Sequence, residues 1–159
     1  MRRLLHAAHR RLGTAAVRLS NLGRPELSLG VRLLALDAAG RVFLVRHSYT
    51  PGLHLPGGGV EVGETCREAA EREAREEGNL VLDAPPEFFH IYCNPVSSLR
   101  DHVALFVARN VRQAAPTRPS LEIVAAGFHA PDALPEALTD GTRRRLDEVL
   151  GGAAPSDHW

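Results

Sequence analysis

At 159 residues, the chain has the length of a single domain with a real hydrophobic core. Its 19 basic and 19 acidic residues cancel, and this neutral balance argues against a general nucleic-acid or membrane binder. The cysteines, Cys66 and Cys93, form no CxxC motif and the histidines show no zinc-binding spacing, so we expect a reduced, cytoplasmic protein.

The first part of the chain is basic and amphipathic. Several arginines but no acidic residue precede Glu26, and leucines and alanines recur between them at helical spacing. We expect an N-terminal helix over residues 1–26 that packs on the domain or on a second copy of the chain, as a homodimer. Targeting to a membrane surface or an organelle stays open, because transit peptides share this composition. No apolar stretch in the sequence is long enough to span a membrane.

Apolar periodicity predicts strands on both sides of a central helix. Alternation places Val42 and Leu44 on one face of a strand, and Phe43, Val45 and His47 on the other. In chain order we expect strands over 27–37 and 41–47, a helix over 66–77, strands over 80–82, 87–93, 101–111 and 121–129 (the last with an initial loop as an alternative), and a helix from 139 or 140 to 150. This order is typical of an α/β sandwich, with a mixed β-sheet between helices. The domain is expected over residues 27–151, followed by a flexible tail over residues 152–159.

A glycine-rich loop at residues 57–59 leads toward the central helix. Thr65 and Glu68 form a capping box at the start of this helix, and Gly78-Asn79 tolerate the left-handed backbone that often ends one. One stripe of the helix combines small residues with three carboxylates, at Cys66, Ala69, Ala70, Glu73, Glu76 and Glu77. Carboxylates on an inward-facing stripe repel one another and are costly to desolvate, so we expect a cation among them. Oxygen ligands of this kind favour Mg²⁺ or Mn²⁺.

These residues resemble the signature of the Nudix hydrolase family, G-x5-E-x7-R-E-U-x-E-E-x-G-U, in which U is aliphatic. The match begins at Gly58, continues through Glu64 and covers residues 72–80. Two positions depart from the pattern: Asn79 stands where the family has glycine, and Ala74 is a small version of U. Asparagine also tolerates a left-handed backbone, so the first departure threatens the helix end little. The resemblance implies the Nudix fold, in which a mixed sheet lies between helices.

The resemblance also implies an activity and a set of site residues. Nudix enzymes cleave, with Mg²⁺ or Mn²⁺, the diphosphate bond of a nucleoside diphosphate linked to another group, such as a nucleotide sugar, ADP-ribose or a CDP-alcohol. By position in the signature, the metal ligands would be Glu73, Glu76 and Glu77, with the carbonyl of Gly57 as a further ligand. Arg72 would orient one of the glutamates. All four charged residues are therefore expected to be catalytic.

Residues outside the signature complete the predicted site. The family often takes a further acidic residue from a later loop, as metal ligand or general base, and Glu122 lies where we expect it; a solvated loop carboxylate is the alternative. Binding of the small-molecule nucleotide is expected from polar residues near the glycine loop and at strand ends: His47, His54, Asn94, Arg100 and His102.

Other functions stay open at this point. A pyrophosphatase that clears unwanted nucleoside triphosphates is the main alternative, and its products would include pyrophosphate. A nucleotide-binding module without hydrolysis is less favoured, because every glutamate of the signature is retained. RNA 5′-end processing is disfavoured by the neutral charge and the lack of an aromatic and basic RNA-binding pattern.

Overall fold

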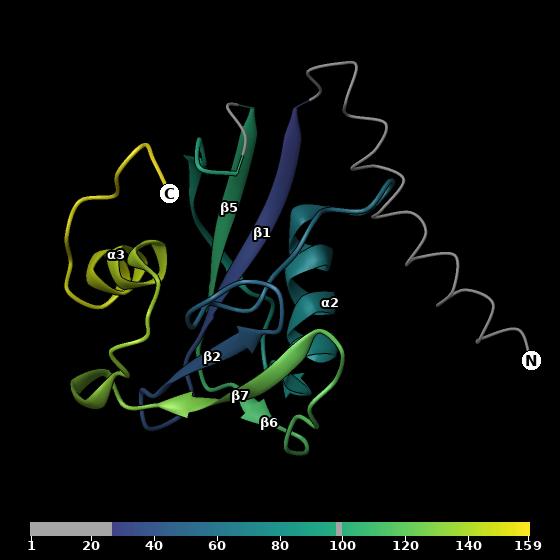
Figure 1. Cartoon of the computed structure of the whole chain (residues 1–159), viewed down its shortest axis with the longest axis vertical. Coiled ribbons are helices and arrows are strands. Elements are labelled where there is room, and N and C mark those ends of the chain that lie inside the picture. The colour runs from purple at the N-terminus through teal and green to yellow at the C-terminus, as the bar shows by residue number, and fades with distance from the viewer. Residues whose placement is uncertain (1–26, 98–99) are drawn as a thin grey trace, which may run out of the picture.

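The computed structural model describes residues 27–97 and 100–159 (Figure 1). The strands are Ser28–Ala35 (β1), Val42–His47 (β2), Leu80–Val81 (β3), Glu87–Cys93 (β4), Asp101–Ala108 (β5), Arg112–Gln113 (β6) and Ile123–His129 (β7). The helices are Cys66–Gly78 (α2), a single 3₁₀ turn at Pro131–Ala133 (η1) and Asp140–Val149 (α3). The N-terminal helix expected over residues 1–26 lies outside the described residues, so that helix and the homodimer inferred from it stay predictions.

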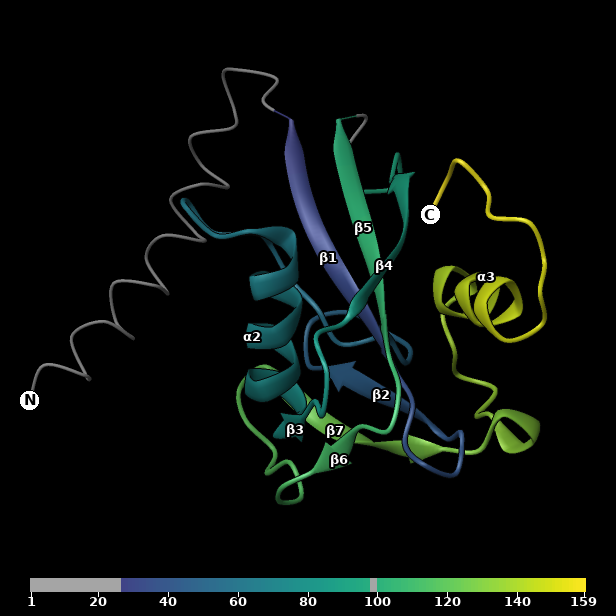
Figure 2. The ribbon, with the colours of Figure 1, turned by 180° about the vertical axis from the view of Figure 1, so that it is seen from behind.

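A mixed sheet forms the middle layer of the domain. Its central strand, β5, is parallel to β1 on one side and antiparallel to β4 on the other. Figures 1 and 2 show α2 against one face of this sheet and α3 beyond the other. Antiparallel β2 and β7 form a second pair, and the short β3 and β6 form a third. The α/β sandwich expected from the sequence is therefore confirmed.

Side-chain alternation divides the core between the two faces. On β2, Phe43 and Val45 join the cluster that contains the alanines of α2, whereas Val42 and Leu44 join the cluster that contains Leu146 of α3. The faces predicted for this strand are confirmed. The predicted strand over 101–111 ends earlier, at residue 108, because Asn110 adopts a left-handed backbone with a φ of 56°.

The ends of α2 are capped as the sequence indicates. The Thr65 hydroxyl accepts a hydrogen bond from the main chain of Glu68, whose side chain accepts one from the main chain of Thr65. At the other end, Asn79 has a left-handed backbone with a φ of 51°. The buried stripe differs in part from the predicted one: Ala74 belongs to it and Glu76 is exposed. The reason is helical geometry, since a stripe that buries Ala74 turns the position two residues later away from the sheet.

The last residues pack on the edge of the sheet, although we expected a flexible tail over residues 152–159. The main chain of Cys93 in β4 donates to the carbonyl of Asp157 and accepts from the N–H of Trp159, each at 2.9 Å. β4 is an edge strand of its sheet, and such an edge has unpaired main-chain groups. The C-terminal segment, residues 152–159, covers part of that edge.

A buried arginine explains how the C-terminal segment is held. The side chain of Arg145 in α3 is 0% exposed, and its guanidinium lies 3.9 Å from the ring centre of Tyr92 and 5.2 Å from that of Trp159. It also forms an ion pair with Glu148 at 2.7 Å, and the hydroxyl of Tyr92 donates to the same carboxyl group at 2.7 Å. A buried charge needs such partners, and Trp159 encloses one side of it.

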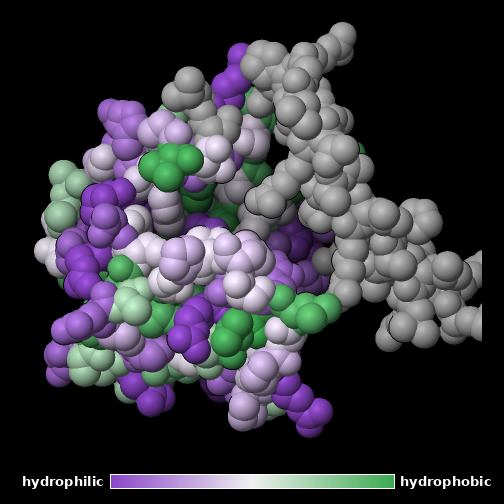
Figure 3. Space-filling model, in the orientation of Figure 1, coloured by the Kyte–Doolittle hydropathy of each residue, from purple (hydrophilic) through white to green (hydrophobic). Residues whose placement is uncertain are grey.

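The surface is mixed in character. Figure 3 shows apolar residues on one face in small groups among hydrophilic ones. Exposed apolar residues that stand singly, such as Val62 and Leu121, are normal for a folded protein. Among the helices of residues 27–97 and 100–159, none is long and apolar enough to cross a membrane.

Gly78 provides a test of the packing between α2 and the sheet. A Cβ atom at this position would lie 2.7 Å from Cγ of Leu80 and 2.7 Å from Cε1 of Phe43. We expect Gly78→Ala to lower the free energy of unfolding by about 1–3 kcal/mol through overpacking, measured by urea denaturation. Gly127→Ala is the control, because a Cβ at Gly127 meets nothing within 4 Å. Equal effects of the two substitutions would contradict the packing argument.

The C-terminal segment can be tested through its last residue. We expect Trp159→Ala to lower the free energy of unfolding by about 1–3 kcal/mol, because it uncovers the guanidinium of Arg145 and removes a cation–π contact. Trp159→Phe, which keeps an aromatic ring there, should recover most of this loss in the same urea titration. Unchanged stability of Trp159→Ala is the behaviour of a free tail and would refute the docked arrangement.

Candidate functional site

The glycine loop lies close to β1 at Gly57 and close to the side chain of Glu73 in α2 at Gly58. Gly57 has a φ of 152°, and a Cβ there would overlap the main chain of Val31 and Arg32. A Cβ at Gly58 would overlap the carboxyl group of Glu73. Main-chain hydrogen bonds, among them one of 2.8 Å from Val31 to Gly58, hold the loop along β1. The loop and the helix therefore meet at one place on the sheet.

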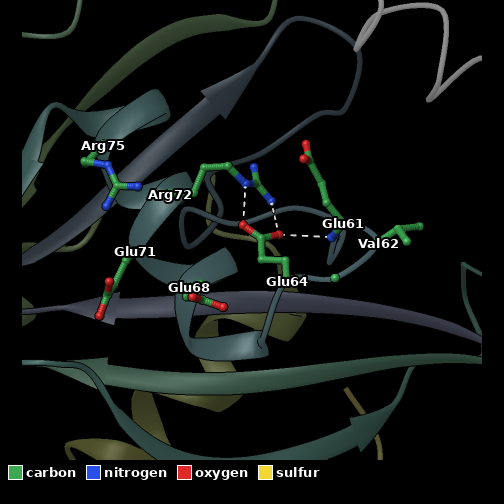
Figure 4. A pocket seen from close by; sticks show the side chains of 8 residues that line it. Glu61, Val62, Glu64, Glu68, Glu71, Arg72 and Arg75 are labelled. Carbon is green, nitrogen blue, oxygen red and sulfur yellow. Dashed lines mark hydrogen bonds and ion pairs between the residues drawn. The ribbon is translucent and has the colours of Figure 1, made fainter. Parts of the chain in front are cut away.

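Arg72 ties α2 to the segment that precedes it. Its guanidinium donates to Glu64 at 2.8 and 3.0 Å, to the carbonyl of Gly59 at 2.9 Å, and to Glu73. Figure 4 shows the pair of Arg72 and Glu64 in an open pocket on the outer side of α2, where Glu64 also accepts from the main chain of Glu61. The bond to Glu73 restricts the position of that carboxyl group, and the catalytic role expected for Arg72 stays a prediction.

The glutamates of α2 differ in their surroundings. The side chains of Glu73 and Glu77 are 12% and 6% exposed, whereas that of Glu76 is 42% exposed. The Oε2 atom of Glu77 accepts a hydrogen bond of 2.9 Å from the N–H of Gly57. The helix thus directs the carboxyl groups of Glu73 and Glu77 inward, whereas Glu76 lies at the edge of the buried face.

A bulge between β2 and β7 brings two further predicted residues to Glu77. The pairing register shifts between Arg46 and His47, and Ser48 then donates to the carbonyl of Glu122 at 2.8 Å. One ligand atom from each of His47, Glu77 and Glu122 lies within 4.8 Å of the others. Bulges commonly re-aim side chains beside active sites. Glu122 is exposed, yet it lies with a glutamate of the signature rather than alone on a loop.

Two residues at this place were missed by the sequence reasoning. The hydroxyl of Tyr49 donates to Oε1 of Glu122 at 3.3 Å. The guanidinium of Arg32 donates to the carbonyls of Leu55 and Gly57 at 2.9 and 3.0 Å. A feature of the sequence could have identified each of them: Tyr49 follows His47 by two residues, and Arg32 is a single charged residue within an apolar strand.

The predicted substrate residues fall into two groups. The ring of His54 lies 5.5 Å from that of His47, between centroids, so these two are near the carboxyl groups. Asn94 and Arg100 lie in the turn between β4 and β5 and His102 lies at the start of β5, and Asn94 donates to the side chain of Asp101 at 2.8 Å. In Figure 1 this turn lies at the same end of the sheet as the start of α2 but on the other side of β1, whereas Glu77 is in the last turn of α2. The structure does not bring these three residues to the glutamates, and their role stays a prediction.

Burial dominates the electrostatics of the site. Burial raises the pKa of Glu77 to about 8. The nearby carboxyl groups of Glu73 and Glu122 also raise this pKa, whereas the hydrogen bond from the N–H of Gly57 lowers it. Burial lowers the pKa of His47 to about 4, helped by the positive charge of Arg32. The contact of 3.6 Å between Nε2 of His47 and Oε1 of Glu77 is therefore not an ion pair at neutral pH.

These groups fit a divalent cation. Burial raises the pKa of Glu73 as well, and nearby Glu76 and Glu122 raise it further against the opposing effect of Arg72. Negative charge gathered in a buried place is unfavourable unless a cation neutralises it, and carboxyl oxygens are the ligands that Mg²⁺ and Mn²⁺ prefer. The carbonyl of Gly57 already accepts from Arg32, so it has one remaining lone pair for a metal.

Comparison with known proteins found similar sequences and similar structures. A family model described as the NUDIX domain matches residues 26–149. A MutT-like protein of Streptomyces ambofaciens is 30% identical over 131 residues, which cover 82% of each chain. A protein of Bacillus subtilis (strain 168) with the provisional name 8-oxo-dGTP diphosphatase is 27% identical over 126 residues, or 78% of this chain and 80% of that one. The crystal structure of a MutT NUDIX hydrolase from Burkholderia pseudomallei has a TM-score of 0.63 at 24% identity, with 78% of this chain and 98% of that chain covered.

Metal binding should stabilise the protein, because a cation would relieve the repulsion among the buried carboxyl groups. With Mg²⁺ or Mn²⁺ at about 100 times its dissociation constant, the free energy of unfolding should rise by about 2.7 kcal/mol over that of EDTA-treated protein. Glu77→Gln should lose most of this gain. Glu71→Gln, on the outer side of the same helix, should keep it. A gain of equal size in all three proteins, measured by thermal unfolding, would place the metal elsewhere.

Proposed function

Because the chain belongs to the NUDIX family, we propose that it uses a divalent metal to hydrolyse the diphosphate bond of a nucleoside diphosphate linked to another group. That group would be a sugar, the terminal ribose of ADP-ribose, or the alcohol of a CDP-alcohol. The observation that carries the proposal is the gathering of Glu73, Glu77 and Glu122 beside the glycine loop. Mg²⁺ is the first candidate for the metal, and Mn²⁺ is a substitute.

The proposal assigns the ligands by position. Glu73, Glu77 and Glu122 would hold the metal, with Glu76 and the carbonyl of Gly57 as further ligands at its margin. Bound there, the metal would neutralise charge on the diphosphate oxygens and favour ionisation of the attacking water. Hydrolysis of a diphosphate depends on charge neutralisation and alignment more than on covalent help, so the positions of these side chains matter most.

The protein's own groups would supply that alignment. The guanidinium of Arg72 fixes the carboxyl group of Glu73, and the N–H of Gly57 fixes that of Glu77. The carboxyl group of Glu122, which accepts a hydrogen bond from Tyr49, is our candidate to accept the proton of the attacking water. Burial, followed by the charges of Glu122 and Glu77, raises the pKa of Tyr49 to about 12, so its hydroxyl stays a donor at neutral pH.

A second candidate is the hydrolysis of a nucleoside triphosphate to a monophosphate and pyrophosphate. It is favoured by the name of the Bacillus subtilis relative, an 8-oxo-dGTP diphosphatase. The same carboxyl groups would serve both reactions, because both break a phosphoanhydride bond. The products separate them: pyrophosphate identifies the second reaction, and a phosphorylated sugar, ribose or alcohol identifies the first.

The proposal is tested by a substrate panel in the presence of Mg²⁺. The panel contains ADP-ribose, nucleotide sugars, CDP-choline, and normal and oxidised nucleoside triphosphates, with products identified by chromatography. We expect turnover of one diphosphate-linked compound, and a loss of about 10²-fold or more in Glu77→Gln. Glu71→Gln should retain the activity of the parent protein.

Each other result has a definite meaning. Release of pyrophosphate from triphosphates would replace the first candidate with the second. Nucleotide binding without turnover, in either Mg²⁺ or Mn²⁺, would refute both and favour a regulatory module. Full activity of Glu77→Gln would show that the chemistry does not use the carboxyl groups of α2.

A further inference from the structure

His47 is a buried polar side chain without a hydrogen bond. Its side chain is 4% exposed, and among the described residues neither ring nitrogen has a hydrogen-bond partner. Buried polar groups in native proteins nearly always have a partner, because an unpaired one keeps the full penalty of desolvation. If His47 only filled space in the core, an apolar ring at this position would give the fold the same stability. The ring of His47 therefore calls for a partner that the protein chain does not supply.

The geometry around His47 suits a shared cation. Its Nε2 atom lies 3.6 Å from Oε1 of Glu77, which is too long for a hydrogen bond. Two ligand atoms that are each about 2.1 Å from one metal ion are about 3–4 Å apart, depending on the angle between them. Glu122 completes a set of three ligand atoms that all lie within 4.8 Å of one another.

Neighbouring rings hold His47 in this orientation without satisfying it. The rings of Tyr49 and His54 lie 5.2 and 5.5 Å away, between centroids. The hydroxyl of Tyr49 is directed to Glu122, and Nε2 of His54 lies 3.1 Å from the carbonyl oxygen of Pro51. Both neighbours thus make a hydrogen bond of their own, whereas neither nitrogen of the His47 ring has a partner among the described residues.

We propose that a ring nitrogen of His47 binds the metal of this site together with Glu77 and Glu122, and that this ligand raises the affinity of the site for Mn²⁺ relative to Mg²⁺. The inference rests on the metal site of the proposed function and adds a nitrogen to its oxygen ligands. Mg²⁺ takes oxygen ligands almost exclusively, whereas imidazole binds transition metals well. One nitrogen ligand therefore shifts the selectivity of an otherwise carboxylate site.

The first test measures metal affinity without substrate. The metal-free full chain is titrated with Mn²⁺, the free ion is followed by EPR, and competition gives the affinity for Mg²⁺. We expect the parent protein to bind Mn²⁺ more tightly than Mg²⁺, and His47→Phe to lose about 10–100-fold in affinity for Mn²⁺ with little change for Mg²⁺. His129→Phe, at the opposite end of β7 from Glu122, is the matched control and should keep the parent affinities.

The second test detects the nitrogen ligand directly, and its main observation is made on the parent protein and not on a variant. Pulsed EPR of the Mn²⁺-loaded parent protein should show the nitrogen modulation of a bound imidazole. The signal should persist in His129→Phe and vanish in His47→Phe, whose fold is checked by circular dichroism. Bound Mn²⁺ without nitrogen modulation in the parent protein would overturn the inference, and so would an unchanged affinity in His47→Phe. Either result would leave the proposed hydrolase intact, because turnover in the substrate panel is measured separately.

Discussion

The close contact between the glycine loop and β1 is the constraint on which the site depends. A side chain at Gly57 would overlap the main chain of β1, so only glycine at this position allows the loop to lie so close to the strand, and Gly58 lies directly beside the carboxyl group of Glu73. The N–H of Gly57 then reaches Glu77, and the carbonyl of Gly59 reaches Arg72. The alanines of α2 contribute to the same convergence, because they let the helix backbone lie near the sheet.

The two faces of the sheet treat buried charge in different ways. On the side of α3, the protein supplies the partners: Arg145 contacts the rings of Tyr92 and Trp159 and pairs with Glu148. On the side of α2, Glu77 and His47 are almost as deeply buried, but their neighbours leave them 3.6 Å apart and without an ion pair. Under the proposed function, a bound cation would neutralise the carboxyl groups on the side of α2.

Strand register links the second half of the chain to this place. The bulge between β2 and β7 sets His47, the last residue of β2, and Glu122, which immediately precedes β7, toward the same carboxyl group. A shift of one residue would turn His47 to the opposite face of its strand. The positions of the two side chains therefore depend on the pairing of β2 with β7. The hydroxyl of Tyr49 also donates a hydrogen bond to the exposed carboxyl group of Glu122.

The sequence by itself determined the features that arise within a few residues of one another. The capping box of Thr65, the left-handed Asn79 and the alternation along β2 depend on local geometry, and the spacing of the glutamates identified the family. Only the tertiary structure decided which distant residues meet. It brought Glu122 and His47 to Glu77, left Asn94, Arg100 and His102 at another turn, exposed Glu76, and packed the C-terminal segment on β4. These outcomes follow from strand register, helix rotation and a covered sheet edge, which are set by contacts between segments far apart in the chain.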